Sequence, residues 1–249
     1  MKWEWAARTD TGRRRSRNED AYLVRPEKRL FAVADGMGGH AAGDVASRMA
    51  VELLDESFHA AMPPGTQPEA VGEALRSAAE EANRAILARG IAEPEKLGMG
   101  TTLTAASPLC PERAVVIAHI GDSRAYRLRR GALNQLTMDH TWVQRQIEEG
   151  HLRPADARKH PLSNVLTRVL GTPENDPPDV IVVDAEDGDL ILLCSDGLTS
   201  MVEDDEVRAI LVGETSLEEK GGELVEAANR QGGLDNVTVL LLRALDGQA

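Results

Sequence analysis

The hydrophobic positions of the chain follow two different spacings. In the first part they recur at helical spacing, with one apolar face between Val45 and Phe58 and a second between Val71 and Ile86. The stretch MPPGTQPE between these faces is rich in proline and predicts a loop. We therefore expect two amphipathic helices, each of which buries one side.

The second spacing is that of β-strands. β-Branched residues dominate short segments separated by turn residues, and these segments predict strands at residues 100–107, 113–123, 124–131, 178–186, 189–197 and 236–245. Several lack polar alternation, so both of their faces should be covered. Two further helices are predicted at residues 203–211 and 216–231. Strands that follow strands, with helices in pairs, favour an α+β fold in which antiparallel sheets are flanked by helices.

Length and charge narrow the class of protein. We interpret the 249 residues as one domain, 1–249, in which the polar segment at about 139–171 forms a flap. The 41 acidic residues exceed the 28 basic ones, and the net charge of −13 argues against nucleic-acid binding. The sequence shows no secretory leader, membrane span or zinc spacing among its 2 cysteines, so we expect a cytoplasmic protein with no membrane insertion.

Four aspartates stand at the ends of apolar segments. Asp35 follows LFAVA, Asp122 follows AVVIAHIG, Asp196 follows LILLCS, and Asp235 comes shortly before VTVLLL. Each one alone is typical of a turn. If the last two strands pair antiparallel, however, Asp196 and Asp235 face each other, and carboxylates that converge at one sheet edge need cations to neutralise them. Together with the carbonyl of Gly36, the pattern indicates a Mg²⁺ or Mn²⁺ centre.

A dinucleotide site is the competing interpretation of the same glycines. Gly36, Gly38 and Ala41 match the GxGxxG/A pattern after a strand and before a helix. That motif also needs a second strand with an acidic residue about 20 residues on, and no such strand is predicted before Gly100. An oxidoreductase is therefore disfavoured.

Eight motifs occur in order along nearly the whole chain: TGRRRSRNED, VADGMGGHAAG, GMGTTLTAA, IGDSRAYRLRRG, LTMDHTWV, HPLSNVLTRVLG, LLCSDGLT and GGLDNVTVLLL. In these motifs the chain resembles the metal-dependent Ser/Thr protein phosphatases of the PPM, or PP2C, family, in their compact bacterial form. The resemblance implies a four-layer αββα sandwich, with two antiparallel sheets flanked by pairs of helices. It also implies a centre of two Mn²⁺ or Mg²⁺ ions.

The ligands that the resemblance implies for the two ions are Glu19, Asp35, the carbonyl of Gly36, Asp196 and Asp235. Asp35 would bridge the ions, with Glu19 and Gly36 serving one and Asp196 and Asp235 the other. Asp122 matches a position that, with Asp196, would hold a third and weaker ion. Asn236 is expected to shape its turn rather than bind metal.

The resemblance also implies residue roles in hydrolysis by a metal-activated water. Arg15, within a run of arginines, would hold the substrate phosphate, and Asp20 would orient the water. Eukaryotic members carry a histidine two residues after the bridging aspartate, where this chain has Met37. Metal-bound water is the favoured proton donor, and the nearby His40 is the other candidate general acid, which would otherwise brace its loop.

We therefore expect a hydrolase that removes phosphate from phosphoserine and phosphothreonine in proteins and opposes a Ser/Thr kinase. The expected partners are phosphorylated proteins and that cognate kinase, and the expected state is a monomer. The alternative is a catalytically silent, phosphatase-like regulatory module. That alternative predicts missing metal carboxylates, whereas Glu19, Asp35, Asp196 and Asp235 are all present.

Overall fold

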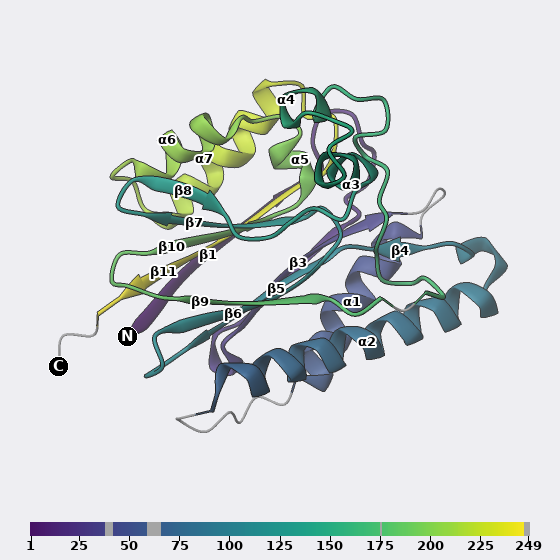
Figure 1. Cartoon of the computed structure of the whole chain (residues 1–249), viewed down its shortest axis with the longest axis horizontal. Coiled ribbons are helices and arrows are strands. Elements are labelled where there is room, and N and C mark those ends of the chain that lie inside the picture. Colours follow the sequence, from purple (N-terminus) through teal and green to yellow (C-terminus); the bar gives the residue numbers. More distant parts are fainter. Residues whose placement is uncertain (38–41, 59–65, 175, 247–249) are drawn as a thin grey trace.

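The computed structural model describes residues 1–37, 42–58, 66–174 and 176–246, and within them two antiparallel sheets pack face to face between helical layers (Figure 1). The five-stranded sheet has the order β1 (Lys2–Asp10), β11 (Val237–Leu245), β10 (Leu190–Cys194), β7 (Arg124–Arg129) and β8 (Ala132–Gln135). The six-stranded sheet has the order β2 (Asp20–Arg25), β3 (Leu30–Met37), β5 (Leu103–Leu109), β6 (Ala114–Ile120) and β9 (Asp179–Asp184), with β4 (Gly100–Thr101) paired to β3.

Strands such as β3, β6, β10 and β11 carry apolar side chains on both faces because each face meets another layer. Phe31 and Val33 of β3 point into the space between the sheets, where they pack with Ile191 and Leu240. The alternate side chains of β3, such as Ala32, pack against the helices instead. The continuous apolar runs of the sequence thus fit strands that are buried on both sides.

Helices cover both outer faces of the sandwich. The six-stranded sheet is covered by α1 (Gly43–Ser57) and α2 (Pro68–Ala92), and the five-stranded sheet by α5 (Asp196–Thr199), α6 (Asp204–Val212) and α7 (Leu217–Arg230) (Figure 1). Ser216 and Glu219 form a capping box that starts α7. Short 3₁₀ turns, η1 (Pro26–Lys28) and η2 (Pro94–Lys96), follow β2 and α2.

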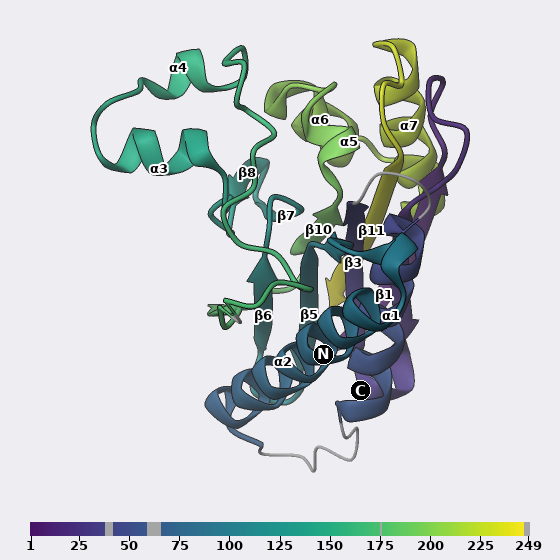
Figure 2. The same cartoon turned by 90° about the vertical axis from the view of Figure 1, so that its right-hand side faces the viewer.

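The segment expected to form a flap leaves the sheets after β8. It contains α3 (Trp142–Glu148) and α4 (Pro154–Ala157), which lie to one side of the sandwich (Figure 2). Isolated bridges join Thr141 to Leu166 and Leu170 to Thr101, so both ends of the segment are tied down. The division of the chain into one domain with a flap at 139–171 stays a prediction.

The α+β sandwich expected from the sequence is confirmed, and so is the antiparallel pairing of the last two strands. The edge strands β1, β2 and β8 were not predicted, because exposed side chains interrupt their buried apolar positions. Part of the predicted loop MPPGTQPE lies outside the described residues. In the described part of the chain, no helix is long and apolar enough to cross a membrane.

Candidate metal centre

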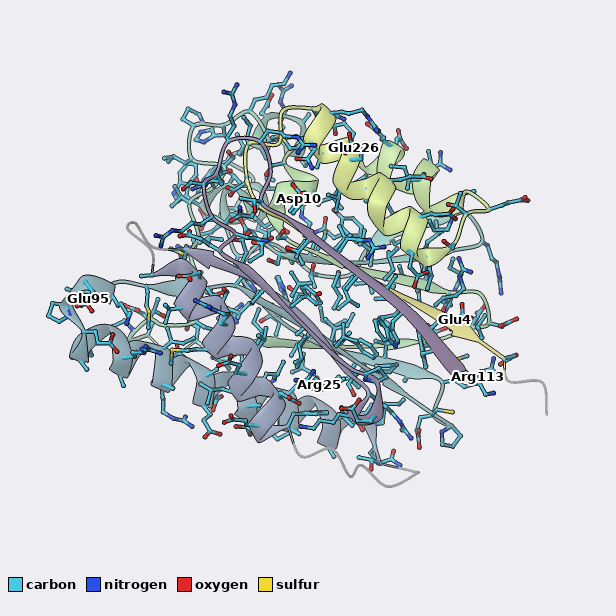
Figure 3. All side chains as sticks on the ribbon, turned by 180° about the vertical axis from the view of Figure 1, so that it is seen from behind. Glu4, Asp10, Arg25, Glu95, Arg113 and Glu226 are labelled. Carbon is cyan, nitrogen blue, oxygen red and sulfur yellow. The ribbon has the colours of Figure 1, made fainter. Side chains whose placement is uncertain are left out.

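The carboxylates at the strand ends gather at one end of the sandwich. Asp10, the last residue of β1, marks this end in Figure 3, and Glu4 lies toward the other end of the same strand. Asp20 and Asp35 are directly opposed on β2 and β3. The ends of β10 and β11 lie side by side, with Cys194 opposite Val239. The strand ends and the loops beside them form a pocket of about 350 Å³. Its lining consists of Arg15, Glu19, Asp35, Gly36, Met37, Thr102, Asp122, Asn164, Leu166, Asp196 and Asp235.

Two glycines bring the Glu19 carboxylate beside the Gly36 carbonyl. The backbone N–H of Gly36 donates to the Glu19 carbonyl at 3.1 Å, which fixes the start of β2 against the end of β3. A Cβ on Gly43 would lie 2.8 Å from both Glu19 Oε2 and the Gly36 carbonyl oxygen. The two oxygens therefore face the same point at the start of α1, and only a residue without a side chain leaves room for them.

Asp20 lies behind the pocket and is held by hydroxyl groups. Ser195 Oγ and Thr238 Oγ1 donate to its Oδ2 at 2.7 and 2.6 Å. Its other oxygen, Oδ1, is buried and has no hydrogen-bond partner within the described part of the chain. Oδ2 is thus fixed by two hydrogen bonds, whereas the buried Oδ1 is unsatisfied and could accept from a donor or bind a cation.

Thr101 at the end of β4 and Thr102, which separates β4 from β5, fix the backbone of Asp35. Its N–H donates to Thr102 Oγ1, and its carbonyl accepts from the N–H of Thr102 and from Thr101 Oγ1, each at 2.9 Å. Thr102 Oγ1 also shares a hydrogen bond of 2.7 Å with Ser123 Oγ, next to Asp122. These hydroxyls connect the positions of the two aspartates, and sequence reasoning did not single them out.

Asn236 fastens the arginine-rich loop to the start of β11. Its Oδ1 accepts from the N–H of Glu19 at 2.8 Å, and its Nδ2 donates to the carbonyls of Thr11 and Arg17 at 2.9 and 2.8 Å. A Cβ on Gly197 would meet the Asn236 carbonyl at 1.8 Å, so α5 begins against this turn. As expected from the sequence, Asn236 shapes the turn.

Burial and mutual repulsion disfavour the charged form of these carboxyl groups. Burial, then Asp20, Asp196, Asp122 and Asp235, raise the pKa of Asp35 well above its ordinary value. Burial is also the first cause that raises the pKa of Asp20 to about 7 and of Asp196 to about 6. The neighbouring Asp235 carboxylate is the next cause that raises the pKa of Asp196, so this group of carboxyls favours bound protons or cations over bare negative charge.

Burial likewise raises the pKa of Glu19 and, well above its ordinary range, that of Asp122. Arg15 contributes a positive charge to the lining of this pocket. Its Nη2 lies 2.7 Å from Asp235 Oδ2, and the hydrogen bond with Asp235 raises the pKa of the guanidinium. About half of the Arg15 side chain is exposed, so it can also contact a ligand that enters the pocket.

The donor set fits hard divalent cations. In the part of the chain that the structure describes, no three acidic, histidine or cysteine side chains are placed to hold one ion as they stand. Five carboxylates and the Gly36 carbonyl nevertheless line one pocket, and the carboxylates repel one another. The orphaned Asp20 Oδ1 belongs to the residue directly opposite Asp35, and all of these donors are oxygen rather than sulfur. Binding would need small side-chain adjustments, such as loosening the Arg15–Asp235 pair.

The structure brings together every predicted site residue that it describes. Seven line the pocket and Asp20 lies behind it, whereas His40 lies outside the described residues. Sequence reasoning missed Thr102, although its motif GMGTTLTAA was noted, and it singled out the segment 139–171 without the particular side chains Asn164 and Leu166.

Comparison with known proteins agrees with this geometry. A family model described as protein phosphatase 2C matches residues 10–237. The chain is 43% identical to the serine/threonine phosphatase stp of Listeria welshimeri, over 94% of this chain and 93% of that protein. A structure of the Mycobacterium tuberculosis phosphatase PstP/Ppp superposes with a TM-score of 0.89 at 39% identity, covering 98% of this chain and 100% of that one. A structure of the PstP catalytic domain with 2 manganese ions gives 0.84 at 40% identity, covering 98% and 99%.

Proposed function

This chain belongs to the protein phosphatase 2C family, and on that premise we propose how its residues remove phosphate from proteins. It is a metal-dependent Ser/Thr protein phosphatase of the bacterial type. The observation that supports the residue roles is the convergence of carboxylates from five separate segments on one pocket that also contains a half-exposed arginine. The catalytically silent alternative has no support.

We assign the metal-binding role to Glu19, Asp35, the Gly36 carbonyl, Asp196 and Asp235, with Asp122 as an additional, weaker ligand. Two divalent cations, when bound, supply a water activated for attack on phosphorus and charge that stabilises the transition state. Bringing cations among these residues would also relieve the repulsion that raises the pKa values of Asp35 and Asp196.

Arg15 binds the substrate phosphate in this proposal. Its guanidinium offers paired donors that match two phosphate oxygens, and its exposed half faces the same pocket as the carboxylates. Asp20 orients the attacking water from behind, with Ser195 and Thr238 fixing one of its oxygens. With Arg15 binding the phosphate and Asp20 orienting the water, hydrolysis in this proposal needs no side chain as nucleophile.

The bond from phosphorus to the serine or threonine oxygen breaks as water attacks, and the departing oxygen must take up a proton. Met37 lines the pocket but has no proton to give. A water molecule is the favoured proton donor in this proposal, and His40 stays the side-chain candidate for the general acid.

We also propose that the substrates are proteins phosphorylated by a cognate Ser/Thr kinase, and that the enzyme is a cytoplasmic monomer. The printed names of its relatives support phosphoprotein substrates. Both cysteines are free, which suits a reducing compartment.

The experiment is phosphate release from a phosphothreonine peptide, with Mn²⁺ and with chelator, by the wild type, Asp35→Asn and a control. Asp205→Asn is the control, because it makes the same change at a carboxylate whose side chain is 98% exposed. We expect Mn²⁺-dependent turnover in the wild type and control and almost none in Asp35→Asn. Equal turnover in all three proteins would overturn the role of Asp35.

A further inference from the structure

A second hollow lies beside the metal pocket. It has a volume of about 340 Å³, roughly twice the ~150 Å³ of a cavity that binds benzene. Its walls include the side chains of Met37, Ile86, Ile91, Leu97, Met99 and Val169. Thr172 is the single polar side chain in its described lining, and its hydroxyl donates to the Val169 carbonyl at 3.3 Å. We call this hollow the apolar pocket.

The backbone holds the apolar pocket open. Gly171 has φ +97°, and a Cβ there would lie 2.6 Å from the Met99 carbonyl oxygen. Asn83, a buried residue of α2, fixes the same wall, because its Oδ1 accepts from the N–H groups of Gly171 and Thr172 at 2.6 and 3.2 Å. A wall pinned in this way needs little ordering when a ligand binds.

Large apolar side chains at the mouth of the apolar pocket face solvent. Ile91, near the end of α2, is 66% exposed, and Leu97, just after η2, is 74% exposed. They lie at the end of the α1–α2 layer that Glu95 marks in Figure 3. Charged groups border them, since Glu93 pairs with Lys96 and Arg89. An apolar centre with a charged rim is typical of a surface that binds another molecule.

The apolar pocket borders the metal pocket, because Met37 lines both. Met37 lies two residues after Asp35 on β3, a separation of about 7 Å along a strand. It pairs with Gly100 of β4, and the next residue, Thr101, is bridged to Leu170. One hydrogen-bonded unit therefore positions both the phosphate site and the apolar wall.

We propose that the apolar pocket binds an apolar side chain of the phosphoprotein substrate, two to four residues from the phosphorylated residue. This inference rests on the proposed function of the neighbouring site. An extended peptide advances about 3.3–3.6 Å per residue, so two residues of substrate span about 7 Å, which is the separation between Asp35 and Met37 along β3. Because the two pockets share Met37 as a wall, a chain bound at the metal pocket lies beside the apolar pocket, and this favours a substrate side chain over an unconnected apolar molecule or a second copy of the chain.

The test uses phosphothreonine peptides in an alanine and serine background, with one leucine placed at each position from −4 to +4. We expect one or two adjacent positions to raise kcat/KM by roughly 5- to 30-fold over the all-alanine peptide, because burying a leucine is favourable. p-Nitrophenyl phosphate, which has no peptide chain, serves as the substrate that cannot use the apolar pocket.

Leu97→Asp and Ile91→Asp place a charge at the mouth without touching the catalytic residues. Both should abolish the leucine preference and leave turnover of p-nitrophenyl phosphate within about two-fold. Val212→Asp is the matched control, since Val212 is 48% exposed on α6 in the opposite helical layer. It should keep the preference.

Each other outcome has a distinct meaning. If the Mn²⁺-loaded enzyme hydrolyses every peptide and shows no leucine position that matters, the inference is wrong while the phosphatase function stands. A preference that survives both aspartate variants would place the selectivity elsewhere and also overturn it. A dimer that Leu97→Asp dissociates, without any leucine preference, would identify a second copy as the occupant. No hydrolysis of any substrate would instead contradict the proposed function.

Discussion

Replacing Asn236 by alanine should weaken both the fold and metal binding, because this side chain joins the loop that carries Arg15 and Glu19 to the start of β11. Asn236 is buried and makes three hydrogen bonds across that junction. At about 0.5–1.5 kcal/mol each, Asn236→Ala should cost roughly 2–4 kcal/mol of unfolding free energy. For a chain of this size that corresponds to a fall in Tm of about 5–15 °C.

Asn236→Ala also removes the hydrogen bond that holds the Glu19 backbone, so the affinity for Mn²⁺ should fall roughly ten-fold. Removing a group that orients a metal ligand commonly lowers metal affinity by about this factor. The assays are thermal unfolding and the Mn²⁺ dependence of peptide hydrolysis. Asn134→Ala, at an exposed position on β8, is the control and should change neither. A normal Tm together with a normal Mn²⁺ half-saturation in Asn236→Ala would refute this reasoning.

Three further predictions address the same site. Gly43→Ala would place a Cβ 2.8 Å from Glu19 Oε2 and from the Gly36 carbonyl oxygen, so we expect the Mn²⁺ concentration for half-maximal activity to rise about ten-fold. Titration of activity with Mn²⁺ checks this, and an unchanged curve would mean that these oxygens bind no ion. Arg15→Ala should lower kcat/KM for phosphopeptides by roughly 10- to 100-fold, with Arg15→Lys intermediate, and steady-state kinetics showing wild-type values would exclude Arg15 from phosphate binding. Without divalent cations, stability should fall as pH rises from about 4 through 7, because the folded pKa of Asp20 is about 7 and an unfolded aspartate near 4 releases its proton earlier. Unfolding scans at pH 5.5 and 8 check this: Mn²⁺ should raise Tm mostly at pH 8, and a Tm without cations that is higher at pH 8 would contradict it.

The parts of the site that lie on long apolar strands could be predicted from the sequence. Asp196 and Asp235 each stand next to a strand with an unmistakable apolar run, and antiparallel pairing of those strands brings the two aspartates together. The fold class followed from the same runs. Glu19 and Asp20 could be placed only through the family resemblance, because β2 is a partly exposed edge strand with a weak pattern.

The supporting contacts could not be predicted, because they join positions far apart in the sequence. Asp20 accepts from Ser195 and Thr238, which are 175 and 218 residues away. Thr102 and Asn164 line the pocket, but nothing in their local sequence distinguishes a buried threonine between two strands or an asparagine in a turn from any other. The apolar pocket was likewise missed, since it is built from α2, β3, β4 and the end of the flap segment.

The most direct test of the account is the number of Mn²⁺ ions that the purified chain binds at equilibrium, measured by dialysis for the wild type, Asp35→Asn and Asp205→Asn. We predict two ions per chain in the wild type and in Asp205→Asn, and a loss of tight binding in Asp35→Asn, because Asp35 is expected to bridge both ions. Wild-type protein that releases phosphate from a phosphothreonine peptide while binding no Mn²⁺ or Mg²⁺, or Asp35→Asn that binds two ions as tightly as the wild type, would contradict it.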